Sequence, residues 1–220
     1  MTPATLQGPS LSPASGAPAA QLVVFLHGVG ADGDDLIALA PYFAHRLPDA
    51  DFLAPHAPFP FDMAPSGRQW FSMGDLSPAS LQAGVDTAAP LLNAWLDAEL
   101  AARGLSDSDL ALVGFSQGTV MALQVALRRK AACRAVVGYS GFLAMPDSLP
   151  EEVTARPPVL LVHGDADEVV PFALMPLAEK ALATIDVPVR VQIRPGLGHG
   201  IDDAGLAAGI DFVARAFGAP

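Results

Sequence analysis

Ser116 is the residue of this sequence with the clearest capacity for covalent chemistry. It lies within Gly114-Phe115-Ser116-Gln117-Gly118, at the junction of two apolar segments. A Gly-x-Ser-x-Gly turn between a strand and a helix imposes unusual backbone angles on the serine and presents its hydroxyl for nucleophilic attack. The amide of Gln117 would then lie at a helix N-terminus, where it can stabilise a developing oxyanion. A glycine-rich turn with a solvated serine gives the same pattern, so partner residues decide its meaning.

A base for Ser116 is expected downstream, because a serine hydroxyl is a poor nucleophile until its proton is removed. When the serine lies in such a turn, the partners follow in the chain order Ser, acid, His, each on a loop after a later strand. His199, within Gly196-Leu197-Gly198-His199-Gly200, follows the last expected strand and is the best candidate. The other four histidines, His27, His45, His56 and His163, are expected to be structural.

The acid that orients this base is expected just after the apolar run 159–162. Three carboxylates follow that run, on Asp165, Asp167 and Glu168. Asp167 has the strongest claim because it lies deeper in the loop, whereas Asp165 can brace the loop by bonding backbone amides.

A second oxyanion donor is expected after the first strong strand, in His27-Gly28-Val29-Gly30. The N–H of Val29 is our choice, because a loop after an early strand supplies this amide in folds that use such a serine turn. The same four residues also fit a simple tight turn.

The elements around these residues alternate between strands and helices, which favours a mostly parallel sheet with helices on both faces. The segment 55–77 is rich in proline, glycine and large apolar residues without a clear period, and we expect a long functional loop there. Strands are expected near 22–26, 51–54, 110–113, 135–139, 159–162 and 189–193, and helices near 34–46, 78–103, 117–130, 172–185 and 202–217.

The composition indicates a folded chain. At 220 residues, with 51% hydrophobic and 16% charged residues, it is too apolar for a disordered protein and fits a single domain. We expect that domain to span 21–220, after a flexible Pro/Ser/Ala-rich tail over 1–20 that lacks the basic residues of a secretory signal.

The net charge argues against two classes of partner. Asp and Glu total 23 against 12 Lys and Arg, which gives a formal charge of −11. Such a surface repels nucleic acid and anionic lipid headgroups, so we expect neither nucleic-acid binding nor stable membrane association. Cys133 has no intramolecular mate for a disulfide, which agrees with a cytoplasmic protein. The sequence allows either a monomer or a homodimer.

No cofactor or metal is indicated by the motifs. Asp32, Asp34 and Asp35 are clustered, but the later ligands of a calcium loop are missing and helix capping, for instance by Asp34, explains them better. Zinc-type spacing, a Walker lysine and a dinucleotide fingerprint are also missing.

Five segments in this order make the chain resemble the phospholipase/carboxylesterase family of α/β-hydrolases, which contains bacterial carboxylesterases and acyl-protein thioesterases. They are FLHGVGADGDDL, RQWFSM, GFSQGTVMAL, HGDADEVVP and GLGHGI, and the resemblance covers about residues 20–217. It implies Ser116 as nucleophile, Asp167 as acid, His199 as base, and the amides of Val29 and Gln117 as oxyanion hole. The chain has Val29 where the family commonly has leucine, and Thr119 where relatives often have glycine.

The resemblance also implies a substrate groove beside the serine turn. The residues that we assign to it are large and apolar, and ordinary core packing is an equal explanation for each. They are Trp70, Phe71, Met73, Leu76, Phe142 and Leu143.

The expected activity is hydrolysis of carboxylic esters through an acyl-enzyme, with a small-molecule or acyl ester as substrate. An acyl-protein thioesterase or lysophospholipase is the alternative within the same chemistry. A non-catalytic binding protein on the same fold is the alternative from another class, since a fold does not guarantee an activity.

Overall fold

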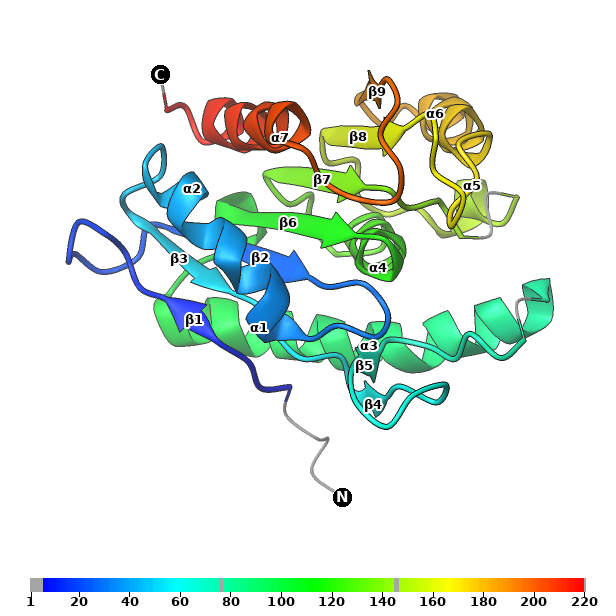
Figure 1. Ribbon diagram of the computed structural model, residues 1–220. Helices are drawn as coiled ribbons and strands as arrows, with labels where there is room; N and C mark the ends of the chain where they lie inside the picture. The colour runs from blue at the N-terminus through cyan, green and yellow to red at the C-terminus, as the bar shows by residue number, and fades with distance from the viewer. Residues whose placement is uncertain (1–5, 76, 145–146, 220) are drawn as a thin grey trace.

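The computed structural model describes residues 6–75, 77–144 and 147–219. Their strands form a seven-stranded sheet and a separate two-stranded hairpin (Figure 1). In the sheet only β1 runs antiparallel to its neighbour, so the prediction of a mostly parallel sheet is confirmed. In spatial order the strands are β1 (Ser10–Leu11), β3 (Ala50–Leu53), β2 (Gln21–Leu26), β6 (Leu110–Phe115), β7 (Ala135–Tyr139), β8 (Val159–Gly164) and β9 (Val189–Arg194).

Helices cover both faces of this sheet, as the alternating pattern predicted. On β2, Val24 and Leu26 face one hydrophobic core, whereas Val23 and Phe25 face the other, and all four side chains are fully buried. A strand that is buried on both faces reads as a continuous apolar run, which is why this segment shows no alternation. The first core includes α3 (Pro78–Arg103), α4 (Gln117–Ala126), α5 (Leu149–Glu152) and α6 (Leu174–Thr184), and the second includes α1 (Gly33–Leu36), α2 (Ala40–Ala44) and α7 (Asp203–Ala216).

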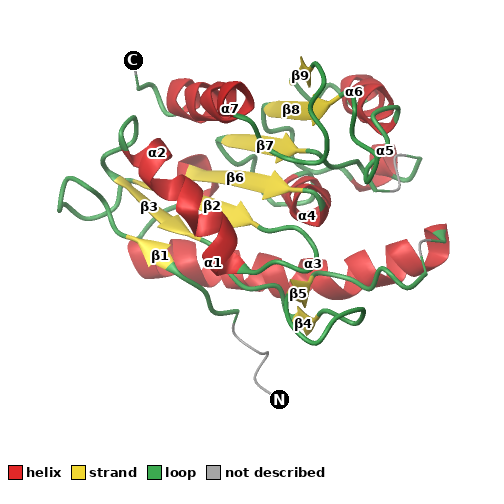
Figure 2. Cartoon of the chain, in the orientation of Figure 1, coloured by secondary structure: helices red, strands yellow, loops and turns green. Residues whose placement is uncertain are grey.

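The parallel strands bring the predicted site residues to one end of the sheet, where the strands finish. Figure 2 shows β2, β6, β7 and β8 pointing the same way, so the loops that follow them gather at the carboxyl ends of the strands. Among the described residues, no helix combines the length and the apolar composition that a membrane crossing requires.

Helix α3 begins and ends where the sequence indicated. The side chain of Ser77 accepts a hydrogen bond from the N–H of Ser80 at the start of the helix. Gly104 ends the helix with a φ of 67°, a left-handed conformation that glycine adopts without steric cost.

The helix expected over 34–46 is interrupted. It divides into α1, the 3-10 turn η1 (Ile37–Leu39) and α2, because Pro41 cannot donate the backbone hydrogen bond that a continuous helix needs. The cap of α1 is Asp32 rather than Asp34, since the carboxylate of Asp32 accepts from the N–H groups of Asp34 and Asp35. Helix α4 ends at Ala126, four residues earlier than expected.

The N-terminal segment is ordered where it is described, so the expectation of a free tail over 1–20 is wrong for residues 6–20. Residues Ser10–Leu11 pair with β3, and the carbonyl of Pro9 accepts from the N–H of Ala54 at 3.0 Å. The edge of β3 offers unpaired backbone groups, and this segment satisfies part of them. Residues 1–5 lie outside the described chain.

The expected loop 55–77 contains a short antiparallel hairpin of β4 (Phe59–Pro60) and β5 (Arg68–Gln69). The N–H of Gly30 donates to the carbonyl of Arg68 at 2.8 Å, and the N–H of Arg68 donates to the carbonyl of Ala31 at 2.8 Å. The hairpin is therefore joined to the loop that follows β2.

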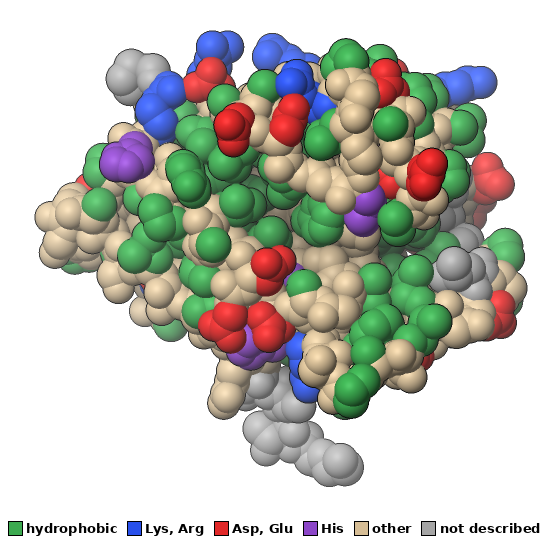
Figure 3. Space-filling view, in the orientation of Figure 1, with side chains coloured by type: hydrophobic (Ala, Val, Ile, Leu, Met, Phe, Trp, Pro, Cys, Tyr) green, Lys and Arg blue, Asp and Glu red, His purple; other side chains and the backbone are tan. Residues whose placement is uncertain are grey.

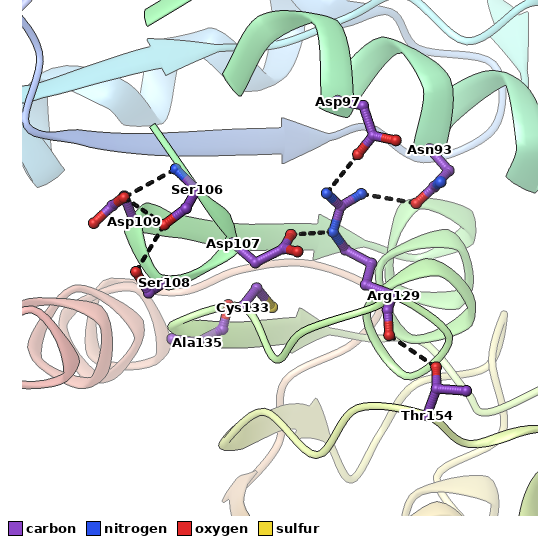
Figure 4. A network of polar contacts seen from close by, with 10 residues as sticks. All are labelled: Asn93, Asp97, Ser106, Asp107, Ser108, Asp109, Arg129, Cys133, Ala135 and Thr154. Carbon is purple, nitrogen blue, oxygen red and sulfur yellow. Dashed lines mark hydrogen bonds and ion pairs between the residues drawn. The ribbon is translucent and has the colours of Figure 1, made fainter. Parts of the chain in front are cut away.

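A buried arginine connects α3 to the segment after α4. The guanidinium of Arg129 donates to Asp97 and to Asn93 on α3, each at 2.7 Å, and also to Asp107 in η2 (Asp107–Asp109) (Figure 4). Its carbonyl accepts from the hydroxyl of Thr154 at 2.8 Å. Three partners compensate the burial of this cation, which would otherwise be costly.

Candidate active site

Ser116 occupies a strained turn between β6 and α4. Its φ of 52° and ψ of −118° are rare for a residue with a side chain, and its N–H donates to the carbonyl of Tyr139 at 2.9 Å. The flanking glycines are required by close contacts. A Cβ on Gly118 would lie 1.8 Å from the carbonyl oxygen of Leu26, and one on Gly114 would lie 2.5 Å from that of Gly118. The pattern Gly-x-Ser-x-Gly is thus explained by packing at both glycines.

The three residues predicted to act together do lie together. Nε2 of His199 is 3.0 Å from Oγ of Ser116, and Nδ1 of His199 is 2.8 Å from Oδ2 of Asp167. Since a carboxylate only accepts, Nδ1 carries the proton and Nε2 is left to accept from the serine hydroxyl. This is the tautomer that a general base requires.

The carboxylate of Asp167 is fully buried and held from two sides. Its Oδ1 accepts from the N–H groups of Val169 and Val170, both at 2.9 Å. Burial disfavours its ionisation, but the hydrogen bonds from His199 and from these two amides outweigh burial and lower the pKa of Asp167. The acid is therefore charged under the conditions in which an imidazolium would form beside it.

Asp165 braces the loops, as the sequence suggested. Its Oδ1 accepts from the N–H of Gly196 at 2.6 Å, which joins the loop after β8 to the loop that carries His199. The two loops touch at Gly164, where a Cβ would lie 2.0 Å from the carbonyl oxygen of Leu197.

The backbone at Gly28 approaches the serine closely. A Cβ on Gly28 would lie 3.2 Å from Cβ of Ser116, which places the following N–H of Val29 beside the serine turn. Within the described chain, the N–H groups of Val29 and Gln117 donate to no protein acceptor. Two backbone donors next to Ser116 are thus available to a ligand.

His27 controls the orientation of this loop, a role that sequence reasoning did not specify. Its Nε2 accepts from the N–H of Ala57 at 2.9 Å, so its Nδ1 carries the proton and donates to the carbonyl of Gly28 at 2.7 Å. In a trans peptide the C=O and N–H point in opposite directions, so fixing the Gly28 carbonyl also aims the N–H of Val29. Burial lowers the pKa of His27, and the bond to Gly28 offsets this only in part.

The side chain of Gln117 holds the segment that contains Trp70. Its Oε1 accepts from the N–H of Trp70, and its Nε2 donates to the carbonyl of Phe71, each at 2.7 Å. The sequence pattern indicated a role only for the backbone N–H of Gln117. A side-chain amide directly after the serine is visible in the sequence. Because an amide both donates and accepts hydrogen bonds, it could have indicated this second role.

The residues expected to line a groove differ in exposure. Trp70 does not form a groove wall: its side chain is fully buried and its indole N–H donates to the carbonyl of His27 at 3.0 Å. Phe71 and Leu143 are likewise buried in the core on this face of the sheet. Met73 and Phe142 are partly buried at its margin. Leu76 lies outside the described residues.

Thr119, the departure from the family pattern, is explained by its contacts. Its buried hydroxyl lies 2.9 Å from the carbonyl oxygen of Gly114 and 2.9 Å from that of Tyr139. Its methyl group fills space that two glycines leave open, since a Cβ on Gly138 would lie 2.5 Å from it. Thr119 therefore joins the serine turn to the end of β7.

Asp32, Asp34 and His56 could hold a metal ion by position, because their ligand atoms lie within 4.8 Å of one another. Local hydrogen bonds already account for two of them. Asp32 caps α1, and Nδ1 of His56 accepts from the N–H of Gly33 at 3.1 Å. Asp32, Asp34 and His56 line one surface hollow, and the positively charged Arg68 lines it too. Helix capping, the explanation expected from the sequence, accounts for Asp32.

The surface around these elements is mixed in character. In Figure 3 hydrophobic side chains are spread over the visible face, acidic side chains lie among them, and most basic side chains lie along its upper edge. The spread of acidic side chains over this face agrees with the excess of Asp and Glu over Lys and Arg in the sequence.

Comparison with known proteins gives a consistent result. The model of the phospholipase/carboxylesterase family matches residues 13–216. Esterase YpfH of Escherichia coli (strain K12) is 31% identical over 194 residues, which cover 88% of this chain and 82% of that protein. Acyl-protein thioesterase 1 of Saccharomyces cerevisiae is 30% identical over 170 residues, which cover 71% of this chain and 74% of that protein.

Solved structures extend the similarity. The crystal structure of esterase PE8 matches with a TM-score of 0.92 and 40% identity, covering 96% of this chain and 99% of that chain. Arabidopsis thaliana SOBER1 matches with a TM-score of 0.78 and 24% identity over 90% of this chain and 99% of that chain, which is a likeness of fold alone. The predicted α/β-hydrolase fold is thus confirmed.

Proposed function

The chain belongs to the phospholipase/carboxylesterase family of α/β-hydrolases, and from this premise we propose that it is a serine carboxylesterase. Ser116 is the nucleophile, His199 is the general base, and Asp167 orients the base and stabilises its charged form. The substrate is a carboxylic ester, and the reaction passes through an acyl-enzyme.

The first half of the reaction transfers the acyl group to the protein. His199 Nε2 takes the hydroxyl proton while Oγ of Ser116 forms a bond to the ester carbonyl carbon. The carbonyl oxygen becomes an oxyanion that accepts from the N–H groups of Val29 and Gln117. The oxyanion then collapses, the bond to the alkoxy group breaks, and His199 gives its proton to the departing alcohol.

The second half releases the acid. His199 takes a proton from water, whose oxygen attacks the acyl carbon, and then returns a proton to Ser116 as the carboxylic acid leaves. The Val29 and Gln117 amides serve the second oxyanion as they served the first. Both steps need His199 in the tautomer that Asp167 imposes.

The observation that carries this proposal is the continuous set of contacts from Ser116 through His199 to Asp167, at 3.0 Å and 2.8 Å, on a strained strand-to-helix turn. A solvated serine in an ordinary turn has no need of a buried carboxylate behind a correctly oriented imidazole. The two unpaired backbone donors beside the hydroxyl support the same conclusion.

Hydrolysis of a short-chain nitrophenyl ester by purified wild-type protein and by Ser116→Ala tests the proposal. We expect turnover by the wild type and its loss in the variant, because the nucleophile is removed. A fluorophosphonate probe should label the wild type and leave Ser116→Ala unlabelled. Turnover that persists in the variant would overturn the assignment, and a wild-type protein without turnover or labelling would favour a binding protein on this fold.

Thioester or lysophospholipid hydrolysis is the second candidate. The sequence similarity to the yeast protein named acyl-protein thioesterase 1 favours it, as does the partly buried Met73, whose sulfur lies 3.6 Å from Nε2 of Gln117. Relative specificity constants for nitrophenyl esters of increasing chain length, an acylated peptide thioester and a lysophospholipid separate these activities. A preference for the peptide thioester over every simple ester would replace carboxylesterase with thioesterase.

A further inference from the structure

A second histidine faces the carboxylate of Asp167. His163 lies on β8 with 2% of its surface exposed, and its Nε2 is 2.9 Å from the carbonyl oxygen of Val170 and 3.2 Å from Oδ2 of Asp167. Both neighbours can only accept hydrogen bonds. Nε2 must therefore carry a proton, because an unprotonated nitrogen would place three acceptors against one another.

The ring of His163 is held in this orientation. It packs against Phe172, with ring centroids 6.1 Å apart and ring planes at 75°, an edge-on arrangement that aromatic pairs favour. Rotation of the imidazole would break the contact with Phe172 and the hydrogen bond to Val170 together.

Asp167 thus accepts three hydrogen bonds and has a further N–H beside it. Oδ1 accepts from the amides of Val169 and Val170, and Oδ2 faces Nδ1 of His199 and Nε2 of His163. An ionised carboxyl offers about four lone-pair positions. Three hydrogen bonds fix this fully buried carboxylate in its plane, and the N–H of His163 lies 3.2 Å from the oxygen that His199 uses.

We propose that His163 is a positioning residue for the reaction: its Nε2–H, which donates to the carbonyl of Val170, lies beside Oδ2 of Asp167 and limits how strongly that carboxylate attracts a proton onto His199. The inference rests on the proposed function. His163 touches neither the substrate nor Ser116, and it acts only through Asp167.

The physical consequence concerns the pH at which the base is lost to protonation. The positive end of the N–H dipole beside Oδ2 offsets part of the charge of the carboxylate and so weakens its stabilisation of an imidazolium at His199. Without this donor, the more concentrated charge would hold a proton on His199 at higher pH. The acidic side of the pH–rate profile would then move upward, because only the unprotonated base activates Ser116.

The other charged groups around this pair are engaged elsewhere or exposed. Asp165 binds the amide of Gly196, Glu168 is exposed, and Arg194 pairs with Asp202 at the start of α7. On the side of the serine turn, His199 faces the Ser116 hydroxyl and the ring of Phe115, whose centroid lies 5.0 Å from that of the imidazole. Within the described residues, none of these charged groups is bonded to Asp167 or His199.

The test compares kcat/KM against pH for ester hydrolysis by wild type, His163→Phe and His163→Gln. Phenylalanine keeps the ring but removes the donor, and the midpoint of the acidic limb should rise by about half a unit or more. Glutamine can place an amide N–H near the position of Nε2 and should restore at least half of that shift.

Leu161→Ala is the matched control. Leu161 is buried on the same strand in the first core, and its side chain has no polar atom that could bond Asp167. Its truncation should lower the melting temperature and leave the acidic limb where the wild type has it. An acidic limb in His163→Phe that coincides with that of the wild type, whatever the melting temperature, would overturn the proposal.

A measurement on the wild type covers the case in which His163→Phe does not fold. Nitrogen-15 NMR of the imidazoles should show His163 protonated on Nε2 throughout the pH range in which activity rises, and a proton on Nδ1 alone would overturn the proposal. The same spectrum separates the two claims. If wild-type protein hydrolyses no ester, the proposed function fails, while the tautomer of His163 still reports whether it presents an N–H to Asp167.

Discussion

The side chain of Gln117 accepts a hydrogen bond from the backbone N–H of Trp70 at 2.7 Å, so the residue that follows the proposed nucleophile also anchors a segment 47 positions earlier in the chain. The same amide donates to the carbonyl of Phe71. Trp70 in turn donates from its indole to the carbonyl of His27, at the start of the loop that contains Val29. The two amides proposed for the oxyanion are thus connected through one set of buried hydrogen bonds.

Removal of the Gln117 side-chain amide should loosen this connection. Gln117→Leu leaves the N–H of Trp70 and the carbonyl of Phe71 buried without partners, which we expect to cost about 2 kcal/mol or more of unfolding free energy. Gln117→Glu keeps the acceptor for Trp70 but places a buried carboxylate oxygen against the carbonyl of Phe71, so its cost should be larger. Urea unfolding gives the order of stability, and hydrogen exchange of residues 68–75 should rise in the same order. Equal exchange in all three proteins would contradict this role.

Glycine at position 116 should be tolerated better than alanine. The φ of 52° at Ser116 is strained for any residue with a Cβ, and glycine removes about 1 kcal/mol or more of that strain. Ser116→Gly and Ser116→Ala lack the hydroxyl alike, so both should lose ester hydrolysis. Thermal unfolding should give Ser116→Gly the higher melting temperature, and a higher value for Ser116→Ala would contradict a strained turn.

The hydroxyl of Thr119 should stabilise the serine turn. Thr119→Val keeps the shape of the side chain but leaves the carbonyl of Gly114 without this donor, at a cost of about 1 to 2 kcal/mol. Thr119→Ser keeps the hydroxyl and should retain most of the wild-type kcat, whereas Thr119→Val should lower kcat with little change in KM. Steady-state kinetics beside urea unfolding would check both effects, and equal kcat in the two variants would argue against a role for the hydroxyl.

Asp167→Asn should remove activity and flatten the response of stability to acid. Asparagine can donate to Nδ1 of His199 and so favour the wrong tautomer, which we expect to lower kcat by about four orders of magnitude. The pKa of Asp167 is lowered in the folded protein, so its charged form contributes stability above the usual carboxyl pKa. That contribution is lost as the pH falls through the lowered value.

Urea unfolding of both proteins from pH 6 down to pH 2 measures the second effect. The wild type should lose more stability than Asp167→Asn across the acidic end of this range. A steeper loss in the variant would show that the carboxylate is not stabilised by folding.

The sequence allowed the sheet, its covering helices and the order Ser116, Asp167, His199 to be predicted, because each depends on local spacing. A buried strand is a short apolar run, and a serine between two glycines at its end marks a turn that side chains would block. The family resemblance implied the same three residues and the same two oxyanion amides. Each of these signals spans only a few residues, which is the range over which sequence patterns are informative.

The missed features depend on contacts between distant segments. The break in the helix over 34–46 follows from Pro41, which was visible in the sequence, but the burial of Trp70 required knowing that His27 and Gln117 surround it. The ordering of residues 6–20 required the open edge of β3. A Pro/Ser/Ala-rich composition describes such a segment poorly when one neighbouring strand can pair with it.

The short strand Ser10–Leu11 also bears on how the protein can be shortened. The family match begins at residue 13, so a truncation designed to that boundary would delete the strand and bare the outer side of β3. In the described seven-stranded sheet β1 and β9 are the two edge strands, so the shortened protein would replace the two-residue edge of β1 with the four-residue edge of β3. A protein trimmed to residue 13 should self-associate more than the full chain at equal concentration. This result would show that a segment with no part in the proposed chemistry protects the edge of β3.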